Sequence, residues 1–217
     1  MMNGIIHELK GLLKPKSIGT DSDRALLLDF QATLETKPEK AIKLEKDALA
    51  QIENITADNA RLVSNLHANL GGLYRMNGYP DLAREHMEKS ISLLDQFNLL
   101  HINDSIPQIA NYAMFLTEQQ EPERGISELQ KLSGIIKEYH SDDCLDYAKV
   151  QETLGTIYLM TANLPQAKTH FKRAFKIYEK IWADEPEMIE AKYQEIQELY
   201  PQIGFCIGKN LSGLLTK

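Results

Sequence analysis

Apolar residues recur along this chain at intervals of three and four, the period of an amphipathic helix. In residues 186–200, for example, Ile189, Tyr193, Ile196 and Tyr200 fall on one side of a helix. Runs of alternating β-branched residues are absent, so the pattern predicts an all-α protein. The helices whose limits the pattern indicates cover about residues 4–13, 22–35, 38–54, 58–78, 80–97, 143–161, 164–182 and 186–200.

One arrangement of small and aromatic residues occurs twice, and it divides the chain into repeats. Residues 154–174 carry Leu154-Gly155, Tyr158, Ala167, Phe171 and Ala174. The same slots 84 residues upstream hold Leu70-Gly71, Tyr74, Ala83, Met87 and Ser90. Because 84 is twice 42, we expect a step of 42 residues.

Two further copies of this arrangement keep only some of its residues. The third keeps its apolar slots, with Gly125 in the place of the first alanine, whereas the first copy has Asp29 where glycine is expected. We therefore predict four repeats over residues 21–183, preceded by a capping helix or arm and followed by a capping helix and an apolar tail. The expected limits are 1–20, 21–57, 58–99, 100–141, 142–183 and 184–217.

The repeated residues form a packing pattern. Two antiparallel helices approach closely only where a side chain is nearly absent, and Gly or Ala in these slots allows that approach. Each helix pair leaves an apolar face for its neighbour, so the pairs are expected to stack into a right-handed superhelix, an α-solenoid. The first helix of each pair would line its concave face.

Charge and composition narrow the classes of function. The net charge of −7 argues against sequence-independent nucleic-acid binding, although it does not exclude a local basic patch. The sequence has no apolar run long enough for a membrane span and no convincing signal peptide. Cys144 and Cys206 form no metal-binding spacing and are expected to be reduced thiols. We therefore expect a cytoplasmic protein with no membrane or nucleic-acid partner.

Motifs of catalysis are missing as well. The sequence contains no HExxH, GxSxG or phosphate-binding loop, so we expect no catalytic residues, metal or cofactor. His86 and His170 occupy the same repeat slot and are interpreted as repeat equivalents, not as ligands of one metal. His67 is expected to pack beside Leu70-Gly71.

The slots in residues 154–174, and nearly as well in 70–90, resemble the tetratricopeptide repeat family over roughly residues 22–182. The 42-residue step is longer than the usual 34. It is similar to the longer repeats of kinesin light chains and of the bacterial peptide-sensing Rap and PlcR regulators, the regulators matching in repeat type only.

The resemblance implies that the concave groove binds a peptide or protein segment, as in an adaptor. Asn69 and Asn111 share one slot, where relatives use asparagine to hold a peptide backbone; the alternative is an asparagine that is merely tolerated. The methionines would form an adaptable floor or belong to the core. The candidate peptide-binding residues are Asn65, Asn69, Arg75, Met76, Asn111, Met114, Lys149, Glu152 and Thr153.

Two other classes of function stay open. A structural protein could self-associate into a homo-oligomer through the N-terminal helix or the C-terminal tail. An enzyme is disfavoured because no set of reactive residues converges.

Overall fold

The computed structural model describes residues 19–103 and 105–199, and within them all regular structure is helical. The all-α prediction is therefore confirmed. The predicted helix at 4–13 and the apolar tail at 201–217 lie outside the described residues. The helices are α2 (Asp21–Thr33), α3 (Pro38–Leu49), α4 (Ala60–Met76), α5 (Pro80–Gln96), α6 (Ser105–Glu118), α7 (Pro122–Tyr139), α8 (Leu145–Met160), α9 (Leu164–Ile181) and α10 (Pro186–Leu199).

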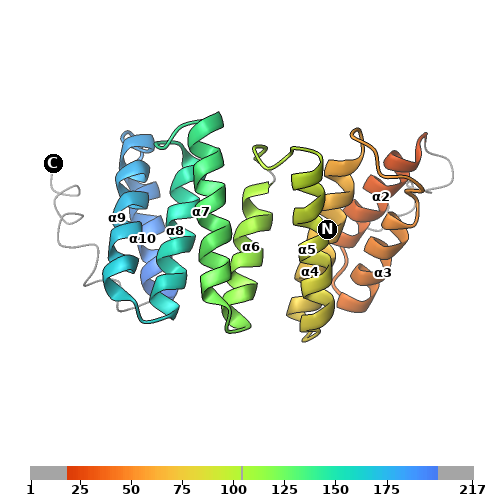
Figure 1. Ribbon diagram of the computed structural model, residues 1–217, viewed down its shortest axis with the longest axis horizontal. Helices are drawn as coiled ribbons and strands as arrows, with labels where there is room; N and C mark the ends of the chain where they lie inside the picture. Colours follow the sequence, from red (N-terminus) through yellow and green to blue (C-terminus); the bar gives the residue numbers. More distant parts are fainter. Residues whose placement is uncertain (1–18, 104, 200–217) are drawn as a thin grey trace, which may run out of the picture. The chain divides into compact units, whose positions relative to one another are not determined.

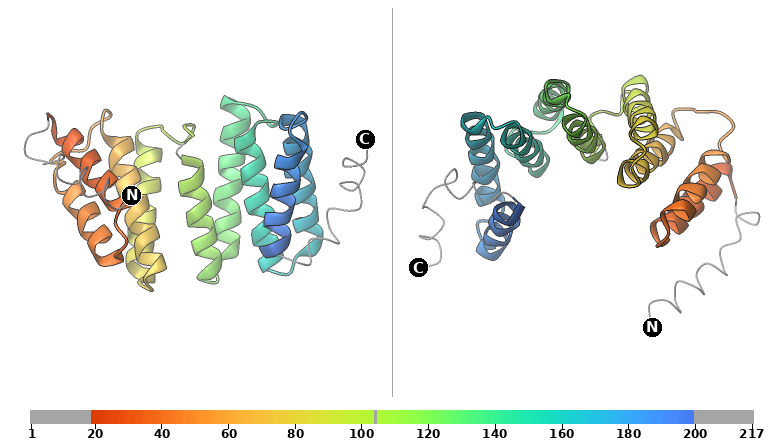
Figure 2. Two further views of the ribbon diagram at one scale, coloured as in Figure 1. Left: turned by 180° about the vertical axis from the view of Figure 1, so that it is seen from behind. Right: turned by 90° about the horizontal axis from the view of Figure 1, so that it is seen from below.

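The chain divides into two compact units, Met1–Gln108 and Ile109–Lys217, and α6 begins in the first and continues into the second. In the first unit α2 pairs with α3 and α4 pairs with α5, while α3 also packs on α4. In the second unit α8 pairs with α9, α7 packs on α8, and α10 packs on α9. Figures 1 and 2 show the α4–α5 and α8–α9 pairs lying side by side.

Proline marks the start of the second helix in each pair. In α3, α5, α7 and α9 a proline occupies one of the first two positions, where its missing N–H leaves no hydrogen bond unmade. At the start of α4 Asn59 occupies the capping position, and its side chain closes the preceding turn by accepting a hydrogen bond from the Thr56 N–H at 2.8 Å.

The turn inside the last three repeats reproduces the 42-residue step in its backbone. Gly78, Gln120 and Ala162 are spaced by that step, and all three have a left-handed backbone, with φ of 76°, 65° and 58°. In each turn the next residue's N–H bonds the carbonyl five residues before it, at 3.0, 2.8 and 2.7 Å. This is the hydrogen bond that ends a helix in a Schellman turn. Only Gly78 adopts this conformation without steric cost.

The glycines of the repeat slots lie where the helices meet. A Cβ atom on Gly125 would lie 2.6 Å from the backbone oxygen of Ala113, so α6 and α7 touch there through their main chains. A Cβ on Gly71 would lie 2.6 Å from the Met87 side chain, and one on Gly155 would lie 2.9 Å from the Phe171 ring. The predicted close approach is therefore present in three repeats.

Helix α7 offers a matched pair of glycines to test this contact. We expect Gly125→Ala to lower the free energy of unfolding by about 1–3 kcal/mol, because a backbone atom cannot move aside cheaply. Gly134→Ala should be neutral or stabilising by up to about 1 kcal/mol, since a Cβ there meets nothing within 4 Å. Urea denaturation of both variants measures the difference, and equal effects would contradict the close-contact explanation.

Candidate functional site

In the first unit the predicted site residues of α4 have different environments. Met76 exposes 84% of its surface, so it is not a core residue. Arg75 is half-buried. The Asn65 side-chain oxygen accepts a hydrogen bond from Gln108 Nε2 at 2.6 Å, and Gln108 Oε1 in turn accepts bonds from the buried hydroxyls of Ser64 and Ser90. Asn65 therefore belongs to a polar network that fixes the first turn of α6 within this unit.

Asn69, the predicted backbone clamp, is engaged inside the protein. Its Nδ2 donates to Asp29 Oδ1 at 2.8 Å and to Glu45 Oε1 at 3.2 Å, although the residue itself is exposed. A peptide that used the amide donor would have to compete with these carboxyl groups. The expectation that Asn69 holds a peptide stays a prediction, with this competition added to it.

The two acids replace the packing pair of the other repeats. Asp29 stands in the slot of Gly71 and Gly155, and Glu45 stands in the slot of Met87 and Phe171. Where the second and fourth repeats place a large side chain over a glycine, the first repeat therefore places two carboxyl groups against each other. Comparison of the repeats within the sequence shows that Asp29 departs from the pattern. It does not show that the Glu45 side chain lies against Asp29.

Glu45 is 2% exposed and its Oε2 makes no hydrogen bond to any described residue. Burial and the neighbouring Asp29 raise the pKa of Glu45 to about 8, although the Asn69 amide acts in the opposite direction. Glu45 is therefore mainly protonated at neutral pH, which avoids two negative charges in contact.

Two histidines occupy equivalent positions in the second and fourth repeats. His86 stacks on Tyr74 with ring centroids 5.4 Å apart, and His170 stacks on Tyr158 at 5.2 Å, so the two histidines are structurally equivalent. Each ring nitrogen Nδ1 has a partner at 2.9 Å, which is Nδ1 of His67 for His86 and the side-chain oxygen of Gln151 for His170. The predicted packing role of His67 thus includes a hydrogen bond between two imidazoles.

Burial and the neighbouring His86 lower the pKa of His67 to about 4. Burial also lowers the pKa of His86, although Glu85 acts in the opposite direction. A bond between two neutral rings needs one N–H donor and one bare nitrogen, and it is lost when both rings are charged. In the parts of the chain that the structure describes, no three His, Cys, Asp or Glu side chains are grouped to hold a metal ion.

In the second unit Asn111 is exposed and Met114 half-buried on α6, while Lys149 and Thr153 lie on α8. The Thr153 hydroxyl donates to the Lys149 carbonyl at 3.0 Å, and the Lys149 ammonium is exposed, 3.9 Å from Asp146. Lys149 is therefore held only by a weak surface ion pair and can change partner easily.

Glu152 holds the last helix in place. Its carboxylate lies 2.9 Å from the Lys192 ammonium of α10 and accepts a hydrogen bond from the Tyr178 hydroxyl of α9 at 2.6 Å. Burial alone would lower the pKa of Lys192, but Glu152 and Glu195 raise it overall. Burial and the Glu152 charge raise the pKa of Tyr178. Glu152 was predicted as a groove contact, and its present partners join α8, α9 and α10.

Beside this network lies a pocket of about 300 Å³, and Lys149 is the one predicted site residue in its lining. Trp182 stacks on Tyr178 with centroids 4.9 Å apart and forms one wall. Sequence reasoning missed the pocket because α10 was expected only to cap the last repeat. The lining residues are Leu145, Lys149, Tyr178, Trp182, Met188, Ala191, Lys192 and Glu195.

A comparison with protein-family models matches residues 105–180 to the tetratricopeptide repeat. A comparison with curated protein sequences gave no match. Across the described residues, none of the helices combines the length and the apolar character that crossing a membrane requires.

Solved structures show the same fold at low identity. BtubC (BKLC) from P. vanneervenii is 19% identical with a TM-score of 0.64, covering 81% of this chain and 70% of that one. A putative kinesin light chain from Podosopora anserina, with nearly identical TPR-like repeats, is 14% identical with a TM-score of 0.66, covering 83% and 90%. MamA is 16% identical with a TM-score of 0.56, covering 82% and 89%.

Glu45→Gln should stabilise the first unit increasingly as the pH rises from about 4.5 to 8. In that range the unfolded Glu45 has lost its proton whereas the folded one keeps it, so rising pH favours unfolding of the wild type. The advantage of the variant should grow by at most roughly 1.4 kcal/mol per pH unit and level off above pH 8. Urea midpoints over this range measure it. Glu39→Gln, in the exposed first turn of α3, is the control, and a constant difference between Glu45→Gln and wild type would refute the raised pKa of Glu45.

His67→Gln copies the Gln151–His170 arrangement into the first unit. Because the pKa of His67 is lowered, the wild type should lose stability as the pH falls from 6.5 towards 4, where only the unfolded histidine takes up a proton. The variant should lose less over the same range, by at most roughly 1.4 kcal/mol per pH unit. Unfolding curves at pH 7 and pH 5 test this, and parallel losses in both proteins would count against it.

Proposed function

We propose that this chain, a tetratricopeptide-repeat protein, binds an extended segment of a partner protein on the faces of its first helices. Repeats of this kind generally serve as protein–protein interaction modules. Because a fold alone does not determine function, the proposal rests on features of the site. We further propose that the protein acts in the cytoplasm as an adaptor or regulator and not as an enzyme.

The observation that carries the proposal is the pocket between α8, α9 and α10. Leu145, Trp182 and Met188 supply apolar groups to its lining, while Lys149 and Glu195 supply charges of both signs. Its volume of about 300 Å³ suits one or two side chains of a peptide. A segment that inserts an apolar side chain would keep its backbone and neighbouring polar groups near the charged edge.

Exposed apolar side chains on the first helices of the first unit support the same role. Leu26 and Phe30 on α2 are 51% and 45% exposed, and Met76 on α4 is 84% exposed. Large apolar groups gain most from a partner that removes them from water, and Phe and Met are enriched at interfaces. The first unit therefore offers first-helix faces with exposed apolar groups, and the second unit offers the pocket between α8, α9 and α10.

Peptides selected from a random display library against the full chain provide the test. Ala191→Trp should weaken the selected peptides by about tenfold or more, because the indole fills the pocket from an exposed position. Asn111→Ala should weaken them by roughly two- to tenfold, the value of one lost hydrogen bond. Titration calorimetry measures both, after circular dichroism has established that each variant is folded.

Ala50→Trp, which adds the same bulk at an exposed position after α3, is the matched control and should leave the affinity unchanged. Full affinity in Ala191→Trp would place the peptides elsewhere and refute the pocket as the site. A library that yields no binder at all would count against segment binding itself.

A further inference from the structure

A second pocket of the second unit carries a concentration of positive charge that contrasts with the acidic chain. It measures about 560 Å³ and lies over α7, the loop that follows it, the start of α8, and α9. Five basic residues and two aspartates line it, in a protein whose net charge is −7. Its lining consists of Lys137, Asp142, Asp143, Tyr147, Lys172, Arg173, Lys176, Ile177 and Lys180.

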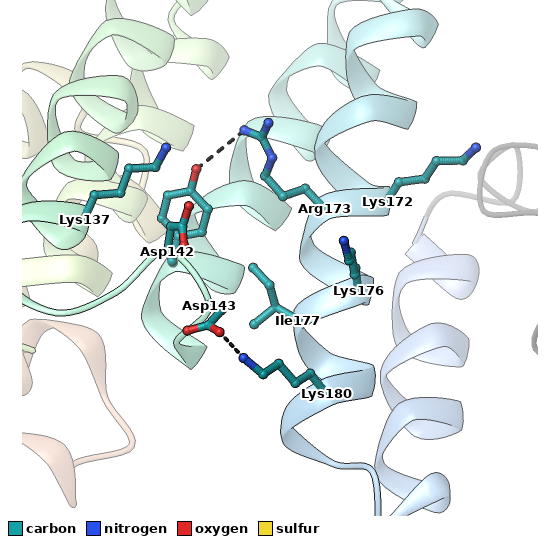
Figure 3. Close-up of a pocket in the computed structure, with 9 residues that line it drawn as sticks. Lys137, Asp142, Asp143, Lys172, Arg173, Lys176, Ile177 and Lys180 are labelled. Atoms are coloured by element: carbon teal, nitrogen blue, oxygen red, sulfur yellow. Dashed lines mark hydrogen bonds and ion pairs between the residues drawn. The ribbon is translucent and has the colours of Figure 1, made fainter.

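Helix geometry explains how the charges come together. Lys172, Lys176 and Lys180 follow one another at intervals of four on α9, so they share one face of that helix. Figure 3 shows the Lys180 side chain directed towards Asp143 of the loop, with Arg173 and Ile177 on the same side of α9 and Lys137 across from them. The second helices α7 and α9 therefore supply all five cations of the recess, and Tyr147 of α8 is the first-helix residue in its lining.

Contacts within the protein engage only some of the basic side chains of this pocket. Lys180 pairs with Asp143, and this contact, together with the Ser141 hydroxyl, holds the pKa of Asp143 below its usual range. Lys137 lies over the buried Tyr147 ring, 5.2 Å from its centroid, and Arg173 donates to the Tyr147 hydroxyl at 3.5 Å. Lys172 and Lys176 are exposed, and neither forms an ion pair with a residue that the structure describes.

The repeats themselves show that packing does not require these charges. The slots of Lys172, Lys176 and Lys180 hold Glu88, Ser92 and Gln96 on α5, and Gln130, Gly134 and Glu138 on α7. The same helix position thus tolerates neutral or acidic residues in two other repeats. Placing three lysines on one face costs electrostatic repulsion, which a bound anion would relieve.

We propose that this pocket binds a short acidic segment of a partner protein, whose carboxylate or phosphoryl groups meet Lys172, Lys176 and Arg173. The aliphatic stems of the lysines and the Ile177 side chain supply apolar contact for the residues between the acidic ones. An extended nucleic acid fits less well, because the cations surround one recess, two aspartates share it, and Tyr147 is buried and offers no face to a base. This site is independent of the first-helix surface.

An array of short peptides tests the proposal. The peptides share one scaffold with an apolar centre and carry zero to four glutamates, or phosphoserines at the same positions, with glutamine and serine as the neutral forms. Binding of the full-length protein should rise with the number of negative groups and fall when the salt concentration is raised. The glutamate and phosphoserine series distinguish the two sources of negative charge.

The double variant Lys172→Glu/Lys176→Glu should lose about tenfold or more in affinity for the acidic peptides, because attraction becomes repulsion at both positions. Lys40→Glu/Lys43→Glu on α3 changes the net charge equally in the first unit and should bind like the wild type. Both double variants should keep the wild-type affinity for the peptides that bind the pocket between α8, α9 and α10. Binding that ignores peptide charge, equal losses in the two double variants, or tighter binding to a single-stranded oligonucleotide or to phosphatidylserine vesicles would overturn the proposal.

Discussion

The structure depends on the close approach of paired helices at positions where one of them lacks a side chain. At Gly125 the backbone of α7 rests on the backbone oxygen of Ala113, and at Gly71 and Gly155 a side chain of the partner helix fills the space. These contacts set the spacing of the α4–α5, α6–α7 and α8–α9 pairs, and the spacing determines which residues of a helix are buried and which remain for a partner. The polar faces of α4 and α8 and the basic face of α9 consist of residues that this spacing leaves unburied.

The same constraint explains why the sequence predicted the fold well. Glycine, alanine and aromatic residues in fixed slots have few other uses at that spacing, so residues 70–90 and 154–174 located their helices closely. The turn also followed the step, even where Gln120 and Ala162 must adopt a left-handed backbone without glycine. Local steric requirements of this kind leave a direct record in the sequence.

The candidate site was less predictable from the sequence because a polar side chain can form hydrogen bonds or ion pairs with any of several partners. The slot of Asn69 suggested a peptide contact, but folding brings Asp29 and Glu45 within hydrogen-bonding distance of its amide group. Glu152 similarly lay on the expected face and is bonded to Lys192 of the last helix. The four basic residues between Lys172 and Lys180 were visible in the sequence, but their meaning depends on Lys137 and the loop that complete the pocket.

The acid pair of the first repeat has a consequence for the heat of folding. Because the pKa of Glu45 is raised to about 8 in the folded chain, folding of α2, α3 and α4 at pH 7 takes up a proton from the solvent at this carboxyl group. That proton comes from the buffer, so the measured enthalpy contains the buffer's own heat of ionisation. The unfolding enthalpy of this protein is therefore a property of the protein and its buffer together, and only values extrapolated to zero ionisation heat describe the helices alone.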